Sequence, residues 1–253
     1  MRSIFLICRK ELKSYFVSPI AYAVLADFAL VFGAAFYVAT SDLARFLPQA
    51  QMQGQPLNLN QQVIGPLLGF AGTVGLFLLP MIAMRLFAEE KRSGTIELLL
   101  TSPVSDLGIV VGKWLGAMAL YACVLGMSML SVVFMFIWGK PDLGPVLVAY
   151  LGLLLQGGCL LALGTWISTT TKDQIVAVVV TFHLSLLLWM LSWFTAYSNS
   201  IPGQVANYMS IVTHMENFSK GVVDLKDVVF YITFTFFGLF CTMRSLESLR
   251  WRS

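Results

Sequence analysis

The chain has 253 residues, of which 58% are hydrophobic and 11% are charged, and its formal net charge is +3. Its mean hydropathy of +0.80 excludes an ordinary soluble fold, because so apolar a chain needs lipid as well as its own core to cover it. The small positive excess does not indicate a nucleic-acid partner. The sequence therefore predicts an all-α membrane protein with one transmembrane domain over residues 1–253.

The first segment, residues 1–18, carries apolar and basic side chains at helical spacing. Ile4 and Leu12 fall on one side of a helical wheel, and Arg9 and Lys13 fall on the other. This pattern predicts an amphipathic elbow helix that lies in the inner interface of the membrane.

Six apolar stretches follow, and each predicts a transmembrane helix. We place them at about 20–40, 63–84, 107–138, 145–168, 175–197 and 228–243. We expect a Gln-rich loop at 41–62, a polar outer segment at 198–227 and a tail at 244–253. Pro66 and Pro80 predict that the second helix is kinked.

Six spans place both termini on one side of the membrane, and the basic residues indicate that this side is the cytoplasm. Most of the 16 Lys and Arg residues then lie inside. These are Arg2, Arg9, Lys10, Lys13, Arg85, Lys91, Arg92, Lys113, Lys172, Arg244, Arg250 and Arg252, whereas Arg45, Lys140, Lys220 and Lys226 lie outside. This distribution follows the positive-inside rule.

Residues 85–106 form the predicted cytosolic connection between the second and third spans. Gly94 can end one helix with a positive φ, and Pro103 stops the short helix expected at about 95–101. So short a helix is not stable alone in water, so its leucines need a surface. Two interpretations follow: a loop that inserts its leucines among lipid headgroups, or an element that another protein binds.

The start of the third predicted span resembles a phosphate-binding loop only in part. Gly108 and Gly112 are one residue too close, and Trp114 follows Lys113 where Ser or Thr would hold magnesium. We therefore expect no nucleotide site in this chain. Gly108, Gly112 and Gly116 instead form a GxxxGxxxG face, which predicts close helix packing.

Two titratable residues lie inside predicted spans. Asp27 is the one carboxylate well inside a span, where a charge is costly, so it should pair, be protonated or face water. A substrate or proton role is one interpretation, and a hydrogen bond to a neighbouring helix is the favoured one. His183 has no second ligand at metal spacing, so we expect an interior histidine with its polar atoms satisfied.

No catalytic constellation is visible in the sequence. It contains no Ser, His and carboxylate set and no HExxH motif. We therefore expect no enzyme activity in this chain alone and no metal site.

The connection between the second and third spans resembles a motif of the permease subunits of ABC-2 type transporters. The family pattern is E-E-x-x-x-G-T-x-E-x-L-L-x-x-P followed by G-K. The chain supplies Glu89, Glu90, Gly94, Thr95, Glu97, Leu99, Leu100, Pro103, Gly112 and Lys113 at these places. The elbow helix and the six spans agree with the same family.

Both ends of the chain are similar to the gliding-motility-associated, or GldF-like, branch of these permeases. The similarity lies in residues 10–22 and 214–222, in Tyr231 and in residues 244–247. Because relatives of this branch occur in organisms that do not glide, the resemblance does not imply a role in motility.

The resemblance implies that the chain is a permease in a bacterial inner membrane. A separate ATP-binding subunit would carry ATP and magnesium, and a second permease copy or a paralogue would complete the transmembrane core. The residues implied in coupling to the ATP-binding subunit are Glu89, Glu90, Arg92, Gly94, Thr95, Glu97, Leu98, Leu99, Leu100 and Pro103. The implied activity is export. The alternatives are an ATP-driven mechanical transmitter and a permease for maturation of an extracytoplasmic enzyme, with an auxiliary extracytoplasmic protein.

Overall fold

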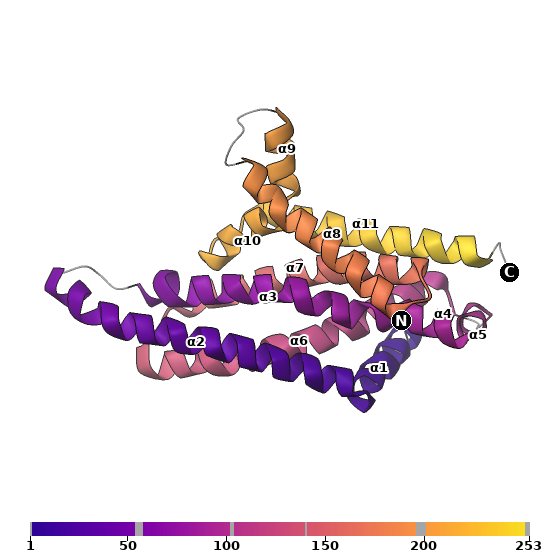
Figure 1. The fold of residues 1–253 in the computed structure, drawn as a ribbon, viewed down its shortest axis with the longest axis horizontal. Coiled ribbons are helices and arrows are strands. Elements are labelled where there is room, and N and C mark those ends of the chain that lie inside the picture. The colour runs from indigo at the N-terminus through magenta and orange to yellow at the C-terminus, as the bar shows by residue number, and fades with distance from the viewer. Residues whose placement is uncertain (1, 54–57, 102–103, 140, 196–200, 251–253) are drawn as a thin grey trace.

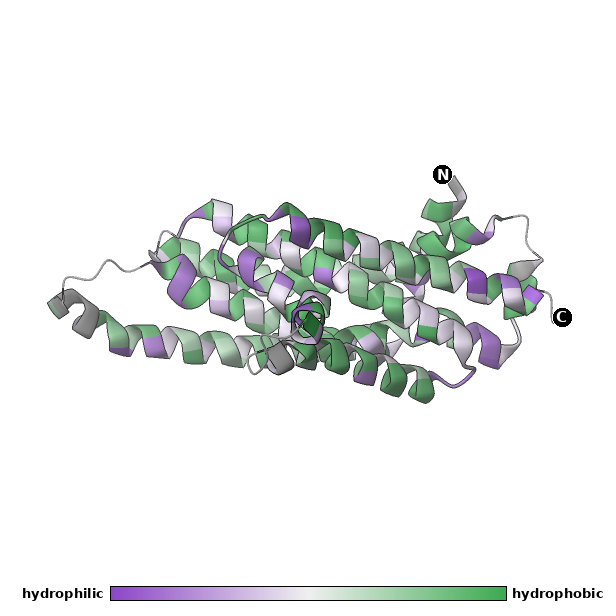
Figure 2. Ribbon diagram, turned by 90° about the horizontal axis from the view of Figure 1, so that it is seen from above, coloured by the Kyte–Doolittle hydropathy of each residue, from purple (hydrophilic) through white to green (hydrophobic). Residues whose placement is uncertain are grey.

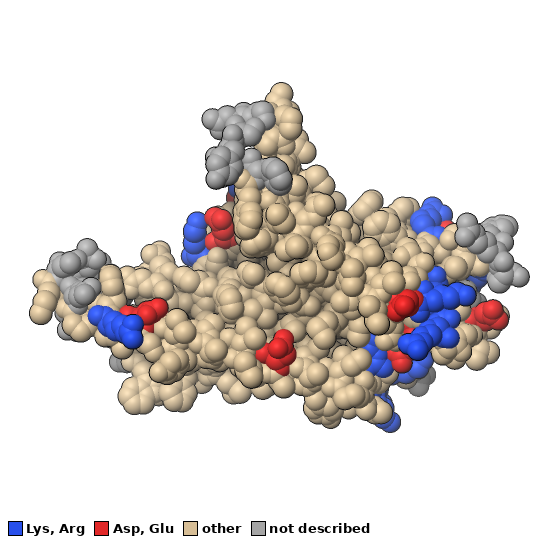
Figure 3. Space-filling view, in the orientation of Figure 1, with Lys and Arg blue, Asp and Glu red and all other residues tan. Residues whose placement is uncertain are grey.

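The chain forms an elongated bundle of helices in a computed structural model (Figure 1). The structure describes residues 2–53, 58–101, 104–139, 141–195 and 201–250, and these residues contain helices and connections without a strand. Apolar residues extend along most of the bundle's length in Figure 2. On the face shown in Figure 3, Lys and Arg gather at the end that carries α4 and α5.

Six helical stretches within the described residues are long and apolar enough to cross a membrane, which confirms the predicted fold class. Eight helices form them: α2 (Pro19–Gln53), η1 (Asn60–Ile64), α3 (Gly65–Ala83), α4 (Arg85–Ser93), α6 (Asp106–Gly139), α7 (Leu143–Thr170), α8 (Gln174–Thr195) and α11 (Leu225–Arg250). The shorter helices are α1 (Arg2–Val17), α5 (Ile96–Leu100), α9 (Ile201–Met209) and α10 (Ile211–Ser219). In Figure 1, α1 and the end of α11 lie at the α4–α5 end of the bundle.

Three connections that the sequence predicted as loops or a tail are largely helical. Helix α2 continues through Gln53 although it includes Pro48, and the other residues of 41–53 are mostly good helix formers. The predicted outer segment contains α9 and α10, which pack on α7, α8 and the rest of the bundle. Helix α11 continues to Arg250, where Leu246 is buried and maintains the apolar face.

The second span is interrupted at Met84, between α3 and α4. Pro66 lies at the start of α3, and Pro80 lies inside α3 one turn before the break at Met84. The amide of Met84 donates to the carbonyl of Pro80 at 3.0 Å, so the turn stays hydrogen-bonded. The prolines therefore lie at the entry to α3 and near its exit.

Helices α7 and α3 form the centre of the bundle. The most apolar window of α7 is 72% buried and that of the second span is 67% buried, compared with 17% for α2 and 22% each for α8 and α11. Close packing occurs around α7, where Gly157 lies against the ring of Tyr121 and Gly152 against Phe218. The outer helices therefore leave broad apolar faces for lipid or for another protein.

Candidate functional site

The corner between α4 and α5 depends on one glycine. Gly94 has φ 73° and ψ 3°, a left-handed conformation that favours glycine, and it ends α4 as the sequence predicted. Beside it, the hydroxyl oxygens of Ser93 and Thr95 lie 2.8 Å apart. Ser93 also donates to the carbonyl of Glu89 at 2.9 Å, so the end of α4 is closed before α5 begins.

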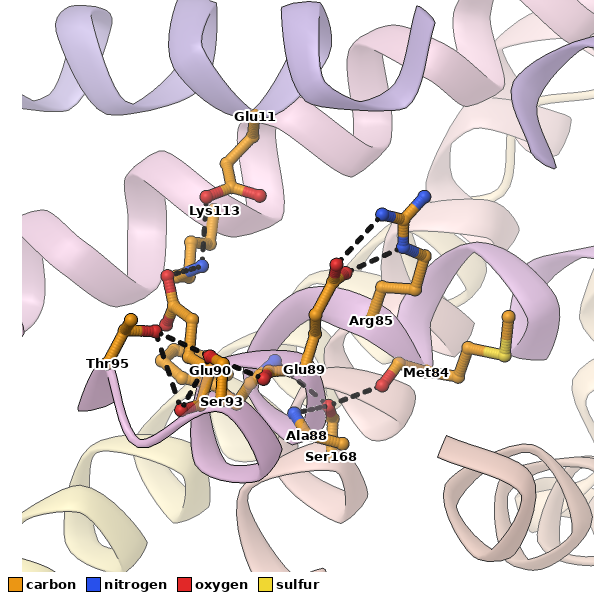
Figure 4. A network of polar contacts seen from close by, with 11 residues as sticks. Glu11, Met84, Arg85, Ala88, Glu89, Glu90, Ser93, Thr95, Lys113 and Ser168 are labelled. Carbon is orange, nitrogen blue, oxygen red and sulfur yellow. Dashed lines mark hydrogen bonds and ion pairs between the residues drawn. The ribbon is translucent and has the colours of Figure 1, made fainter. Parts of the chain in front are cut away.

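Lys113 connects three helices beneath this corner (Figure 4). Its Nζ lies 2.9 Å from Oε1 of Glu11 on α1 and 2.9 Å from Oε1 of Glu90 on α4, and its side chain is only 2% exposed. It also lies 5.2 Å from the centre of the Phe87 ring. A buried ammonium needs such partners, so the three side chains form one unit.

A second ion pair reinforces α4. Arg85 donates from Nε and Nη2 to the two carboxylate oxygens of Glu89, at 2.7 and 3.1 Å. Next to it, the hydroxyl of Tyr15 on α1 donates to the carbonyl of Ile82 at 2.7 Å. Burial raises the pKa of Tyr15 well above its usual range, so this phenol stays a donor. Helix α1 is thus held to the end of α3 as well as to α6.

The break between α3 and α4 is bridged from α7 by a single hydroxyl. The amides of Phe87 and Ala88 donate to Oγ of Ser168 at 3.0 Å each, and Ser168 donates to the carbonyl of Met84 at 2.9 Å (Figure 4). Backbone groups that a helix break exposes need such partners. Helix α4 is therefore fixed to the most buried helix of the bundle.

Two of the three glycines of the GxxxGxxxG face, Gly112 and Gly116, lie close against α1. A Cβ at Gly112 would lie 2.9 Å from Cβ of Ile7, and a Cβ at Gly116 would lie 2.7 Å from Cβ of Glu11. A Cβ at Gly108 would meet Oγ of Ser105 at 3.1 Å. This face thus receives the amphipathic helix α1, and it places Glu11 within reach of Lys113.

Replacing Gly112 by alanine should lower the free energy of unfolding by about 1–3 kcal/mol, because the new methyl group displaces α1. Thermal unfolding of the purified protein measures this loss. The matched control is Gly126→Ala on the same helix, where nothing lies within 4 Å of the added Cβ. An equal change in both variants would contradict the packing argument.

A cleft of about 450 Å³ opens between α1, α4 and α5. Its lining residues are Lys10, Glu11, Ser14, Arg85, Glu89, Glu90, Ser93, Thr95, Leu98, Leu99 and Lys113. At its edge Leu98 is 72% exposed, and Glu97 and Arg92 are also exposed. The charged residues inside the cleft are therefore held by ion pairs, whereas its edge carries an exposed leucine and an exposed glutamate.

The residues implied in coupling fall into two groups. Glu89 and Glu90 are bound to Arg85 and Lys113 within the chain, whereas Glu97 and Leu98 project from α5. Leu99 packs partly against the core. Leu100 ends α5, but its side chain and Pro103 lie outside the described residues.

Sequence reasoning missed the partners of Lys113 and the role of Ser168. Glu11 is the one acidic residue in a segment otherwise rich in basic residues, which was an available signal. Ser168 gave no signal, because a serine near the end of an apolar span is common and its partners lie about eighty positions earlier. Contacts between distant segments decide both roles.

The structure places Asp27 and His183, the two titratable residues predicted inside spans, on exposed faces of α2 and α8. Asp27 is exposed on α2 and makes no hydrogen bond or ion pair with the part of the chain that the structure describes. His183 is exposed on α8, and its Nδ1 lies 2.7 Å from the carbonyl of Val179. Both side chains point away from the bundle because the apolar residues of their helices fill the buried faces.

A second buried polar cluster lies at the opposite end of the bundle. Oδ1 of Asp227 is 2.6 Å from Nδ1 of His214, and its Oδ2 accepts from Asn217 at 2.8 Å. Nε2 of His214 lies 2.8 Å from the carbonyl of Tyr208, and Tyr231 donates to the carbonyl of Ile211 at 2.8 Å. These contacts tie α9 and α10 to the start of α11, a role that the sequence analysis did not assign.

An all-helical chain with six candidate spans and a charged corner at one end is a multi-pass membrane protein. The family model described as ABC-2 family transporter protein matches residues 5–241. The chain therefore belongs to the ABC-2 transporter family and is a membrane subunit of an ABC transporter, which works with an ATP-binding partner. Among curated proteins, none matches the chain in sequence.

Proposed function

We propose that this chain is the permease of an exporter in a bacterial inner membrane and that its α4–α5 corner binds a separate ATP-binding subunit. One observation carries the proposal: Glu97 and Leu98 project from a short helix that directly follows α4, and α4 is bound to α6 and α7. An exposed leucine beside an exposed carboxylate is suited to bind a protein groove with an apolar floor and a basic edge.

The contacts within the corner suggest how movement would be transmitted. A displacement of α5 would move α4, and α4 is connected to α7 through Ser168 and to α1 and α6 through Lys113. The ATP-bound and ATP-free partner would favour two different positions of this unit. The permease would then switch as a rigid body between two states.

Replacing Glu97 by lysine should reduce recovery of the ATP-binding subunit about tenfold, because a charge reversal opposes a basic groove edge. The measurement is a pull-down of the tagged permease from detergent, with mass spectrometry and an ATPase assay of the eluate. Leu98→Ala should weaken recovery to a similar extent, because an interfacial leucine contributes about 1.5–3 kcal/mol when buried.

Glu216→Lys on α10 is the matched control, since this exposed glutamate lies at the opposite end of the bundle. Its ATPase recovery should equal that of the unmodified chain. The proposal fails if folded permease recovers no ATPase, or if Glu97→Lys and Leu98→Ala retain full recovery and full coupled activity.

An outer cavity supports an amphipathic substrate. About 670 Å³ lies between α2 and the η1–α3 segment, with a mostly apolar lining that includes Phe46, Leu67 and Phe70. Asp42 and Gln62 add polar atoms to the same cavity. A site with an apolar wall and a few polar groups suits a lipid-linked or otherwise amphipathic molecule better than a small ion.

The α9–α10 segment favours a second candidate function, in which ATP-driven motion acts on an extracytoplasmic partner. Ile201, Val205 and Tyr208 on α9 expose more than half of their surface. If the chain is such a transmitter or a permease for enzyme maturation, the pull-down should also contain an extracytoplasmic protein. Val205→Asp should then abolish recovery of that protein but leave recovery of the ATP-binding subunit unchanged. We also propose that the chain belongs to the gliding-motility-associated branch of this family, because residues 10–22 and 214–222 resemble that branch. Membership of this branch does not imply a role in motility.

A further inference from the structure

Helix α9 stands out from the bundle in Figure 1, and little of it is buried. Of its nine residues only Gly203 is buried, and the helix packs mainly on α8. Its last turn is tied to two other helices through one side chain. The carbonyl of Tyr208 faces Nε2 of His214 on α10, and Asp227 on α11 faces Nδ1 of the same ring. His214 therefore connects the end of α9 to the bundle.

The two contacts of the ring determine how many protons it shares with Asp227. A carbonyl oxygen cannot donate, so the 2.8 Å contact with Tyr208 requires a proton on Nε2. The 2.6 Å contact between Nδ1 and Oδ1 of Asp227 requires a second proton, held by either atom. A neutral ring beside a carboxylate has only one proton to share. The observed geometry thus contains one proton more, and with it the pair carries no net charge.

The surroundings of the pair suit this protonated state. The ring of Phe230 stacks on His214 with the centroids 4.0 Å apart, and an aromatic face attracts positive charge. The second carboxylate oxygen of Asp227 accepts from Asn217 at 2.8 Å. His214 and Asp227 are only 3% and 1% exposed. Water can therefore replace a lost contact of the ring only if the protein moves.

Within the described residues, Asp227 is the charged group that contacts the ring. Helices α3, α7 and α9 contain no charged residue, and His183 of α8 contacts the carbonyl of Val179 on its own helix. The charged side chains of α10 and of residues 220–226 pair with one another, and the titratable rings that face His214 are tyrosines. These groups are Glu216 with Lys220, Asp224 with Lys226, and the rings of Tyr208 and Tyr231.

We propose that His214 and Asp227 form a proton-operated latch on α9, closed while the pair holds its second proton and opened when a rise in pH removes it. Removal leaves one proton, which stays in the charge-assisted contact between Nδ1 and the carboxylate. Nε2 and the carbonyl of Tyr208 then face each other as two acceptors, and the buried pair carries a negative charge. Movement of the Tyr208 end away from the ring relieves both costs, because it admits water.

The part that opens is the junction between α9 and α10. Ser210, the residue between the two helices, is fully buried, so its exposure reports the opening. Thr213 donates to Oδ1 of Asn207 at 3.0 Å, and this contact does not titrate, so the movement is local. The latch does not depend on the proposed ATP-binding partner. Only its effect on an extracytoplasmic protein bound at Val205 rests on the second candidate function.

The test measures how fast a maleimide labels Ser210→Cys in the full-length protein in detergent, from about pH 5 to about pH 8, where histidine is the side chain that ordinarily changes charge. The serine hydroxyl has no hydrogen-bond partner among the described residues, so the cysteine removes none. Each rate is divided by that of Val223→Cys, which is 51% exposed, so the pH dependence of thiol chemistry cancels. Peptide mass spectrometry separates these labels from those on the native cysteines. The ratio should rise several-fold as the pH increases.

The chain has two histidines, so each can be tested in turn. His183→Gln should leave the rise unchanged, whereas His214→Gln cannot titrate and should give a ratio that does not change with pH. Asp227→Asn removes the carboxylate that shares the proton and should give a high ratio at every pH, which provides a second measurement if His214→Gln does not fold.

Three results overturn the latch: a flat ratio in the chain with both histidines, the same rise in His214→Gln, or the same rise in Asp227→Asn. Recovery of the ATP-binding subunit is scored separately. A failed latch with the ATPase retained therefore leaves the proposed function standing.

Discussion

Replacing Lys113 by methionine is expected to destabilise the permease by about 3–5 kcal/mol, because the loss of one partner strands buried charge. Lys113 is 2% exposed and is bound to Glu11 and Glu90, which are themselves largely buried. Thermal unfolding in detergent should show the loss. ATPase stimulation by the remaining folded fraction should also fall, because α1 and α4 lose their connection.

The same change at Lys13 is the matched control, since Lys13 is exposed on α1 and should tolerate methionine. Adding Glu11→Gln and Glu90→Gln to Lys113→Met should recover much of the stability, because no uncompensated charge then remains. Unchanged stability in Lys113→Met would show that the three side chains do not act as a unit.

Replacing Asp227 by alanine is expected to cost about 3 kcal/mol, because His214 and Asn217 then lose their common acceptor in a buried site. The damage should concentrate in α9 and α10. We expect faster cleavage of this segment by protease added from the outer side, together with a lower unfolding temperature.

Asp224→Ala is the matched control, since Asp224 pairs with Lys226 at the surface, 3.0 Å away. The side-chain hydrogen bond from Lys226 holds the pKa of Asp224 below its ordinary value. Any stability that this pair contributes is lost only as the pH falls into the acidic range, so it is fully present at neutral pH. The exposed pair contributes little, and Asp224 also accepts from the amide of Lys226 at 3.1 Å, so Asp224→Ala should cost much less stability than Asp227→Ala. Equal protease sensitivity in both variants would refute a special role for Asp227.

The number of spans followed from the sequence because each apolar run is bounded by charges or by helix-breaking residues. The ends of the helices did not follow. Polarity suggested a loop at 41–62, yet α2 continues through Gln53 with Asp42, Arg45 and even Pro48 inside it. Helix α11 likewise continues past the end of its apolar run.

The corner at Gly94 was predictable because a left-handed residue is a local property of the chain. The ion pairs of Lys113 with Glu11 and Glu90, which lie next to this corner, could not be predicted. Lys113 follows Gly112 in a pattern that suggested packing or a failed phosphate loop, and its partners lie in segments that the sequence treats as separate. Local spacing reports helix faces, but only tertiary structure reports which faces meet.

Asp27 and His183 show a different limit. The cost of polar groups in a span led to the expectation of partners inside the same chain. The structure instead places both on exposed helix faces, and His183 makes its polar contact with the carbonyl of Val179 on its own helix. Sequence spacing alone did not reveal which face of each helix is buried in the bundle.

The ion-pair unit of Glu11, Glu90 and Lys113 also sets an order of events during synthesis. Lys113 is 102 positions after Glu11, so α1 leaves the ribosome long before its counter-charge exists. Until α6 has been made, Glu11 lacks this counter-charge, and α1 can contact only the membrane surface, α2 and the end of α3. Final seating of the N-terminus is therefore a late step, and it takes place only after the first three spans have been inserted.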